Sequence, residues 1–296
     1  MLLEIDRVLL ATPDAADAAA KWRARVGAEE VGRDRVGWLG ARRTTLRAGT
    51  SDLELVEPDG EGLLADELRR RGRAHLFAAG ATADDPAAMA ARAARAGAAC
   101  HAEGASQVIT IEIEGAPIRF VVSPPADRAK AGRLDFLYEA TVLAADQAGA
   151  VERISRTFGL DSAHFTEITS ETFGYTGVLT LFRPGQLHRF EVITPTDMQK
   201  TMGRYYARER ASFYMAFAES GRMLEIERGA RADGAGITVD RPPERADAIT
   251  ADQLWLHPPA MGGMMLGVSR PTMAWLWSGA PERVEKLPAG AKAQRP

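Results

Sequence analysis

The sequence contains one cysteine, Cys100, and five histidines in 296 residues. A single cysteine excludes an intrachain disulfide framework and any cysteine-rich zinc or iron–sulfur site. No apolar run approaches the roughly 20 residues that a membrane-spanning helix needs, and the first residues lack the basic and then apolar order of a signal peptide. The net charge of −3 offers no general attraction to nucleic acid or to an anionic membrane. We therefore expect a cytoplasmic protein that binds neither of them.

The composition is otherwise that of a folded globular protein. Hydrophobic residues make up 46% of the chain and charged residues 26%, which argues against a disordered chain. The length corresponds to about two domains. Internal repeats decide whether these two domains are related to each other.

Eight short segments have the character of β-strands, and they fall into two groups. One group ends at a proline, which suits a strand end because proline cannot donate a hydrogen bond to the ladder. The other group opens a unit, and most of these openers precede a helical stretch. The proline-ended strands are 53–58, 118–124, 190–195 and 266–271, the openers are 5–10, 74–78, 138–142 and 212–217, and the clearest helices are 14–26, 84–96 and 146–158.

The coarse pattern is one strand, one helix and two or three further strands, repeated four times. Equivalent positions of the two halves lie 132 to 138 residues apart, which indicates a duplication. We expect one domain at residues 1–124 and a second at 135–279, each built from two modules. A polar, proline-bearing linker at 125–134 joins them, and a tail follows at 280–296.

Two stretches resemble elements of the vicinal oxygen chelate superfamily, also called the glyoxalase/bleomycin-resistance/dioxygenase fold. They are LELVEP at 53–58 and LHPPAMGGMMLG at 256–267. The resemblance covers about residues 3–279 and implies an α+β fold, in which four βαβββ modules form two tandem cups of curved, mostly antiparallel sheet. The superfamily includes isomerases, epimerases, lyases, dioxygenases and non-catalytic drug-sequestering proteins, and the fold does not choose between them.

The resemblance also implies which positions line each cup, because metal-dependent members take their ligands from the openers and closers. Arginine has no lone pair to give to a metal, and phenylalanine and glycine side chains have no donor atom. We therefore predict no cofactor, although a magnesium-like ion held by Glu139, Glu191 and water stays open. The positions carried over are Arg7, Glu54, His75 and Arg119 in the first cup, and Glu139, Glu191, Phe213 and Gly267 in the second.

In the first cup, the simpler interpretation is a structural ion pair between Arg7 and Glu54. His75 is more often a hydrogen-bonded core histidine than a catalyst, and with Arg119 it forms at most a secondary site. The register of the second closer is open, because counting back four residues from its proline selects Phe120. That choice would place Arg119 on the opposite face of the strand.

In the second cup, two carboxylates share a poorly hydrated space. Burial and like charge raise the pKa of one of them, so Glu139 and Glu191 are candidates for a general acid and a general base. The alternative is that Glu139 pairs with an arginine such as Arg189 or Arg183, or that one carboxylate lies in water at the rim. The sequence does not decide between these interpretations.

Aromatic and methionine side chains gather in the second half, where they form either an adaptable ligand-binding wall or ordinary core. His257 is either a turn-stabilising residue or part of a hairpin over the cup mouth. The segment 196–209 is either a core-covering helix or a lid. The predicted substrate-binding residues are Phe213, Tyr214, Met215, Tyr175, His257, Met265 and Trp275.

The sequence thus predicts a metal-independent isomerase or lyase. Its substrate would be a small apolar or aromatic molecule with a carbonyl or hydroxyl group, held in the C-terminal cup. The first alternative is a non-catalytic small-molecule binding protein of the bleomycin-resistance type. A metal-dependent glyoxalase or extradiol-type dioxygenase ranks last. Four modules complete two cups within one chain, so both a monomer and a homodimer are compatible with the pattern.

Overall fold

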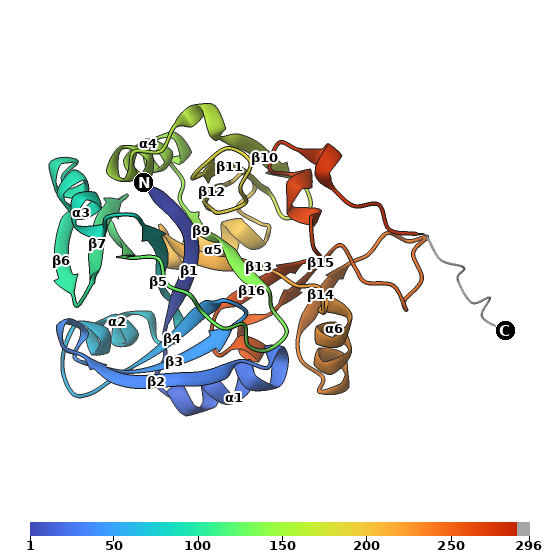
Figure 1. The fold of residues 1–296 in the computed structure, drawn as a ribbon, viewed down its shortest axis with the longest axis horizontal. Coiled ribbons are helices and arrows are strands. Elements are labelled where there is room, and N and C mark those ends of the chain that lie inside the picture. Colours follow the sequence, from blue (N-terminus) through green and yellow to red (C-terminus); the bar gives the residue numbers. More distant parts are fainter. Residues whose placement is uncertain (289–296) are drawn as a thin grey trace.

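Two curved eight-stranded sheets form the frame of the protein in the computed structural model, which describes residues 1–288 (Figure 1). The first sheet consists of β1 (Leu2–Ala11), β2 (Glu29–Val36), β3 (Ala41–Ala48), β4 (Ser51–Pro58), β5 (His75–Ala83), β6 (Ala99–Glu103), β7 (Ser106–Ile113) and β8 (Ala116–Ser123). The second consists of β9 (Phe136–Leu143), β10 (Thr166–Ser170), β11 (Tyr175–Leu181), β12 (Arg189–Pro195), β13 (Ser212–Glu219), β14 (Ile237–Asp240), β15 (Gln253–Leu256) and β16 (Met265–Ser269).

The strand order of the two sheets is the same. The first sheet runs β2-β3-β4-β1-β5-β8-β7-β6, and the second runs β10-β11-β12-β9-β13-β16-β15-β14. In each module the opening strand pairs in parallel with its own closing strand, as β1 does with β4 and β9 with β12. The remaining ladders are antiparallel. The predicted α+β fold of four βαβββ modules in two tandem cups is therefore confirmed.

Each module carries one helix between its first and second strands, and short signals in the sequence set the ends of three of them. Asp14, Asp85 and Asp146 each accept a hydrogen bond from a backbone N–H of the first helical turn, which caps the helix. Gly27 and Gly159 end two of the helices in the left-handed conformation. The module helices are α1 (Ala15–Val26), α3 (Pro86–Arg95), α4 (Gln147–Phe158) and α6 (Met223–Ala232).

Two further helices lie outside the modules. α2 (Leu63–Arg71) connects the first two modules, and its Leu64 belongs to an apolar cluster with strands of the N-terminal sheet. α5 (Thr201–Glu209) connects the last two modules, within the segment predicted to be a core-covering helix or a lid. Each cup thus has one extra helix associated with it.

The main apolar core spans both sheets, because one cluster of buried side chains includes residues from both halves and from all four module helices. An aromatic group lies at its centre. The ring of Phe120 on β8 has its centroid 5.0 Å from that of Phe158, 4.7 Å from that of Phe190 and 5.5 Å from that of Phe213. The two halves therefore bury apolar surface against each other.

The segment 125–134, which we predicted to be a linker, lies against the N-terminal half. Ala131 pairs with Gly49 in an isolated β-bridge, and the N–H of Arg133 donates to the carbonyl oxygen of Val26 over 2.7 Å. Within the predicted tail, Pro281–Arg283 forms a short 3-10 helix, while residues 289–296 lie outside the described part. None of the helices in residues 1–288 is long and apolar enough to cross a membrane.

We predict that Phe120→Ala lowers the free energy of unfolding by about 3–5 kcal/mol, because it leaves a cavity among three other aromatic rings. Since this core belongs to both halves, denaturant unfolding followed by circular dichroism should still show one transition, at a lower midpoint. Met198→Ala, at a half-exposed side chain, is the control and should change little. A loss below about 1 kcal/mol for Phe120→Ala would contradict the prediction.

Candidate functional site

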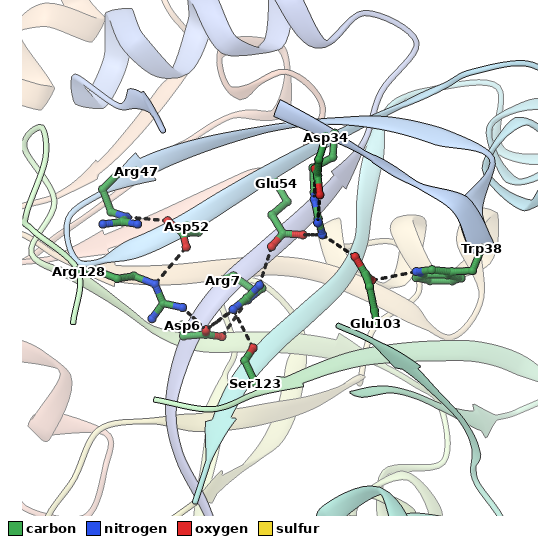
Figure 2. A network of polar contacts seen from close by, with 11 residues as sticks. Asp6, Arg7, Asp34, Trp38, Arg47, Asp52, Glu54, Glu103, Ser123 and Arg128 are labelled. Atoms are coloured by element: carbon green, nitrogen blue, oxygen red, sulfur yellow. Dashed lines mark hydrogen bonds and ion pairs between the residues drawn. The ribbon is translucent and has the colours of Figure 1, made fainter. Parts of the chain in front are cut away.

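The cup of the N-terminal sheet contains a connected network of charged side chains (Figure 2). The Arg7 guanidinium donates to Glu54 over 2.7 Å and to Asp6 over 2.8 Å. Arg43 binds the second oxygen of Glu54 over 3.0 Å, and Arg128 from the segment after β8 binds Asp6 over 2.7 Å. The carboxylates of Asp6 and Glu54 are buried. Arginines therefore already neutralise the acids in this cup.

His75 and Arg119 lie at a different place in the same half. His75 Nδ1 is 3.0 Å from the carbonyl oxygen of Arg73, and burial lowers the pKa of its imidazole to about 4. The Arg119 guanidinium lies over the ring of Phe77, 4.5 Å from its centroid. Phe120 is part of the main core, so its neighbour Arg119 faces the cup side of β8. The structure does not bring these two residues to the Arg7–Glu54 pair.

The cup of the C-terminal sheet brings Glu139 and Glu191 together. The hydroxyl of Thr141 lies between them, 2.5 Å from Glu191 Oε2 and 3.3 Å from Glu139 Oε1. Glu139 and Thr141 are two residues apart on β9, so their side chains lie on the same face of the strand. Glu191 lies on the neighbouring strand β12. All three side chains are buried.

Arg189 supplies the positive charge of this cluster. It lies two residues before Glu191, hence on the same face of β12, and its Nε donates to Glu139 Oε2 over 2.7 Å. Its Nη1 donates to the carbonyl oxygen of Leu187 and to the hydroxyl of Ser278. The side chain is completely buried. Of the two alternatives for Glu139, the structure shows the pairing with Arg189.

The two carboxyl groups therefore differ in charge. Burial first, and the negative charge of Glu139 second, raise the pKa of Glu191 well above its ordinary value. Glu139 has the Arg189 guanidinium as its direct counter-ion, whereas the nearest polar groups to Glu191 are the Thr141 hydroxyl and the Glu139 carboxyl group. The arrangement therefore favours an ionised Glu139 and a protonated Glu191.

Four of the predicted substrate-binding residues belong to one apolar cluster in this cup. They are joined there by Phe173, Phe217 and Trp255, and by Met202 and Tyr205 of α5, which covers the cluster. The Tyr205 and Tyr214 rings meet edge to face with centroids 4.7 Å apart. The four predicted residues are Tyr175, Tyr214, Met215 and Met265.

The other three predicted residues lie elsewhere. Phe213 packs in the main core against Phe120. Trp275 belongs to a separate cluster with Tyr138 and is covered by the Arg283 guanidinium. His257 is outside the cup, where its Nε2 is 2.9 Å from the hydroxyl of Thr238.

Phe217 is the residue of β13 that faces Glu139 and Gly267 in the two adjacent ladders. Phe213 was the residue predicted at this place, and one register irregularity in the β13–β9 ladder, between Phe213 and Met215, separates the two positions. The glycine at position 267 was a sequence signal that a large side chain lies against this strand. A Cβ at Gly267 would lie 2.2 Å from Cε1 of Phe217. Arg189 was already named as a possible partner of Glu139. Thr141 was detectable in principle, because it lies two residues from that glutamate on the same strand.

Comparisons with solved structures find the same fold over most of the chain. A triple mutant of 4-hydroxymandelate synthase from Streptomyces coelicolor superposes with a TM-score of 0.69 and 15% identity, covering 91% of this chain and 93% of that chain. A xylose isomerase-like TIM barrel/4-hydroxyphenylpyruvate dioxygenase fusion protein gives 0.64 and 11% identity over 91% of this chain, which spans about half of the fusion protein (49%). No protein-family model and no curated protein sequence matches the chain.

These neighbours show the tandem vicinal oxygen chelate fold and correct two predictions. They are a 4-hydroxymandelate synthase and a protein that contains a dioxygenase, and dioxygenases are the metal-dependent class ranked last above. The predicted metal-independent isomerase or lyase is therefore wrong, and so is the prediction of no cofactor. The physical reason within the site is that Arg189 holds Glu139, so the two glutamates are not a free acid and base pair.

The donor atoms in the cup do not fit an iron centre as they stand. Iron oxygenases of this type of site use two histidines and one carboxylate, whereas the facing positions here are Glu139, Glu191, Phe217 and Gly267. Within residues 1–288, no three histidine, cysteine or acidic side chains lie close enough together to hold a metal ion. The oxygens of Glu139, Thr141 and Glu191 meet at the cluster, and Arg189 already neutralises one carboxylate.

We predict unequal losses of stability for two matched substitutions. Glu139→Gln leaves the buried Arg189 without a counter-ion, so it should lower the free energy of unfolding by about 3–5 kcal/mol. Glu191→Gln replaces a neutral carboxyl group by a neutral amide and should cost far less. Denaturant titrations of both variants at pH 8 give the comparison. Equal losses would contradict the assignment of charge.

The raised pKa of Glu191 also predicts a pH dependence. A carboxyl group whose pKa is raised by folding stabilises the protein below its unfolded value, and this contribution is lost as the pH rises through the folded value. Glu191→Gln cannot ionise, so its melting temperature relative to wild type should increase steadily above about pH 5. A constant difference between pH 5 and pH 9 would contradict this prediction.

Proposed function

We propose that the C-terminal cup binds a small aromatic molecule that carries a hydrogen-bond-accepting oxygen, and that the N-terminal cup is structural. The observation behind this proposal is the contrast in content between the two cups. Arginine pairs neutralise the acids of the first cup, whereas the second combines aromatic and methionine side chains with one neutral carboxyl group. Ligand pockets typically combine an apolar wall with a few polar groups that orient the ligand.

Three side chains are suited to orient the oxygen of such a ligand. Burial and the charge of Glu191 raise the pKa of the Tyr175 hydroxyl, and burial raises the pKa of Tyr214 to about 12. These raised pKa values favour the protonated forms of both phenols and of the Glu191 carboxyl group, so all three are suited to donate a hydrogen bond. A carbonyl or ether oxygen is the matching acceptor. Tyr175, Tyr214 and Met265 would provide the apolar contacts.

Two classes of protein share this binding step. The fold neighbours favour an enzyme with oxygenase chemistry that depends on a metal. The absence of histidines from the facing cup positions favours a protein that binds its ligand without changing it. Because both cups are complete within one chain, binding at this site requires no second copy.

We expect acetophenone to bind more tightly than ethylbenzene, which has a similar shape but no oxygen. One hydrogen bond predicts a difference of roughly fivefold in Kd by isothermal titration calorimetry. Glu191→Leu removes the donor and should reduce the difference, while Glu191→Gln retains a donor and is the matched control. The proposal fails if the two ligands bind equally to wild type, or if neither binds.

Metal loading decides between the two classes. If the oxygenase interpretation is correct, protein incubated with Fe(II) under nitrogen should retain about one equivalent after gel filtration, measured by elemental analysis. With an aromatic ligand, this protein should then consume oxygen in an electrode cell, and Glu191→Leu should lower both values. Protein that retains no metal and returns the ligand unchanged would contradict the oxygenase interpretation and support the binding protein.

A further inference from the structure

A pocket of about 240 Å³ lies where α5 meets the N-terminal half. Its floor includes Tyr205 of α5 together with Tyr214 and Met265, which also belong to the apolar cluster of the C-terminal cup. The hairpin that carries Pro258 and Gly263 forms another side. The pocket therefore borders the cup from outside and is shared by both halves of the chain.

Glycine at position 263 makes this arrangement possible. Its φ is +125°, and a Cβ there would lie 2.5 Å from the Cβ of Ala74. The hairpin thus approaches the start of β5 more closely than any side chain would permit. Met265, two residues later, lines the pocket together with Arg73 and Leu76.

The pocket lining is strongly positive. Arg73, Arg204 and Arg208 line it, and no acidic residue does. Glu209 lies buried behind it and binds Arg73 and Arg208, each over 2.6 Å, as well as Arg71 over 3.0 Å. Arg204 pairs with no carboxylate within residues 1–288, and the one side-chain hydrogen bond it makes there goes to the carbonyl oxygen of Gln199. The single negative charge of Glu209 can compensate at most one of the three lining arginines. Two positive charges of the lining therefore stay uncompensated.

The two paired guanidinium groups are held in place. Those of Arg73 and Arg208 lie over the Tyr205 ring, 5.5 Å and 5.6 Å from its centroid. Their bonds to the buried Glu209 fix them further. Burial works against ionisation of Glu209, but Arg208, Arg73 and Arg71 hold its pKa below the ordinary value. Fixed guanidinium groups with a surplus of charge are typical of sites that bind phosphate or carboxylate through paired hydrogen bonds.

We propose that this pocket binds the phosphoryl group of a small molecule, with an aromatic part of the same molecule against Tyr214 and Met265. A surplus of two positive charges matches a phosphate monoester, which carries close to two negative charges at neutral pH. A monocarboxylate would leave one charge uncompensated. The assignment of the aromatic part rests on the function proposed for the cup, whereas the assignment of the anion does not.

The test is a set of calorimetric titrations of the full chain with phenyl phosphate, inorganic phosphate and phenylacetate at constant pH and ionic strength. Arg204→Gln is the informative variant because it breaks no ion pair. A melting temperature equal to that of wild type will show that this variant folds. Arg228→Gln removes the same charge from the exposed face of α6 and is the matched control. We expect Arg204→Gln to raise the Kd for phenyl phosphate by roughly tenfold or more, and Arg228→Gln to leave it unchanged.

Each other outcome has a defined meaning. Equal Kd values for the two variants, or no binding of phenyl phosphate to wild type, would overturn the site. Phenylacetate binding as tightly as phenyl phosphate would overturn the choice of a dianion. If inorganic phosphate binds in an Arg204-dependent way while the phenyl group adds nothing, the anion site is supported and its link to the cup is overturned. Failure of acetophenone to bind the cup would leave the inorganic phosphate result unaffected.

Discussion

The buried ion pair between Arg189 and Glu139 determines the chemistry of the C-terminal cup. A lone charge in this position would be prohibitively unstable, so the guanidinium and the carboxylate require each other. Once Glu139 is ionised and paired, Glu191 has a negative neighbour and no cation of its own. Burial first, and this negative neighbour second, raise the pKa of Glu191 well above its ordinary value. The polar character of the cup, a neutral hydrogen-bond donor among aromatic rings, follows from this one pair.

The two cups show how one duplicated scaffold takes on different contents. Arg7 on β1 faces Gly80 on β5, and a Cβ at Gly80 would lie 2.2 Å from the Arg7 side chain. In the second cup, Phe217 has the same relation to Gly267. Each glycine makes room for one large side chain, a guanidinium that joins an ionic network or an aromatic ring that joins an apolar wall. The fold fixes the available space, and the occupying side chain fixes the chemistry.

The repeat pattern was readable because local signals repeat with it. Asp14, Asp85 and Asp146 cap the three helices that were clearest in the sequence. The fourth module helix, α6, follows Arg222, which makes no side-chain cap, and no bounds for it were predicted from the sequence. The glutamate pair was predictable because each residue has a fixed place in its module. Phe217 was not, because an irregularity in the β13–β9 ladder shifts the register between Phe213 and Met215, and a local pattern carries no information about pairing between distant strands.

The position of α5 explains why the N-terminal half matters to a site that it does not contain. The apolar face of this helix covers the C-terminal cup, but its last residue, Glu209, is buried against Arg71 and Arg73 from the other half. Tyr206 adds a second link, because its hydroxyl donates to Glu114 over 2.7 Å. A nine-residue helix is marginal by itself in water. The cover of the cup is therefore stabilised from outside, and any movement of α5 must break contacts with the N-terminal half of the protein.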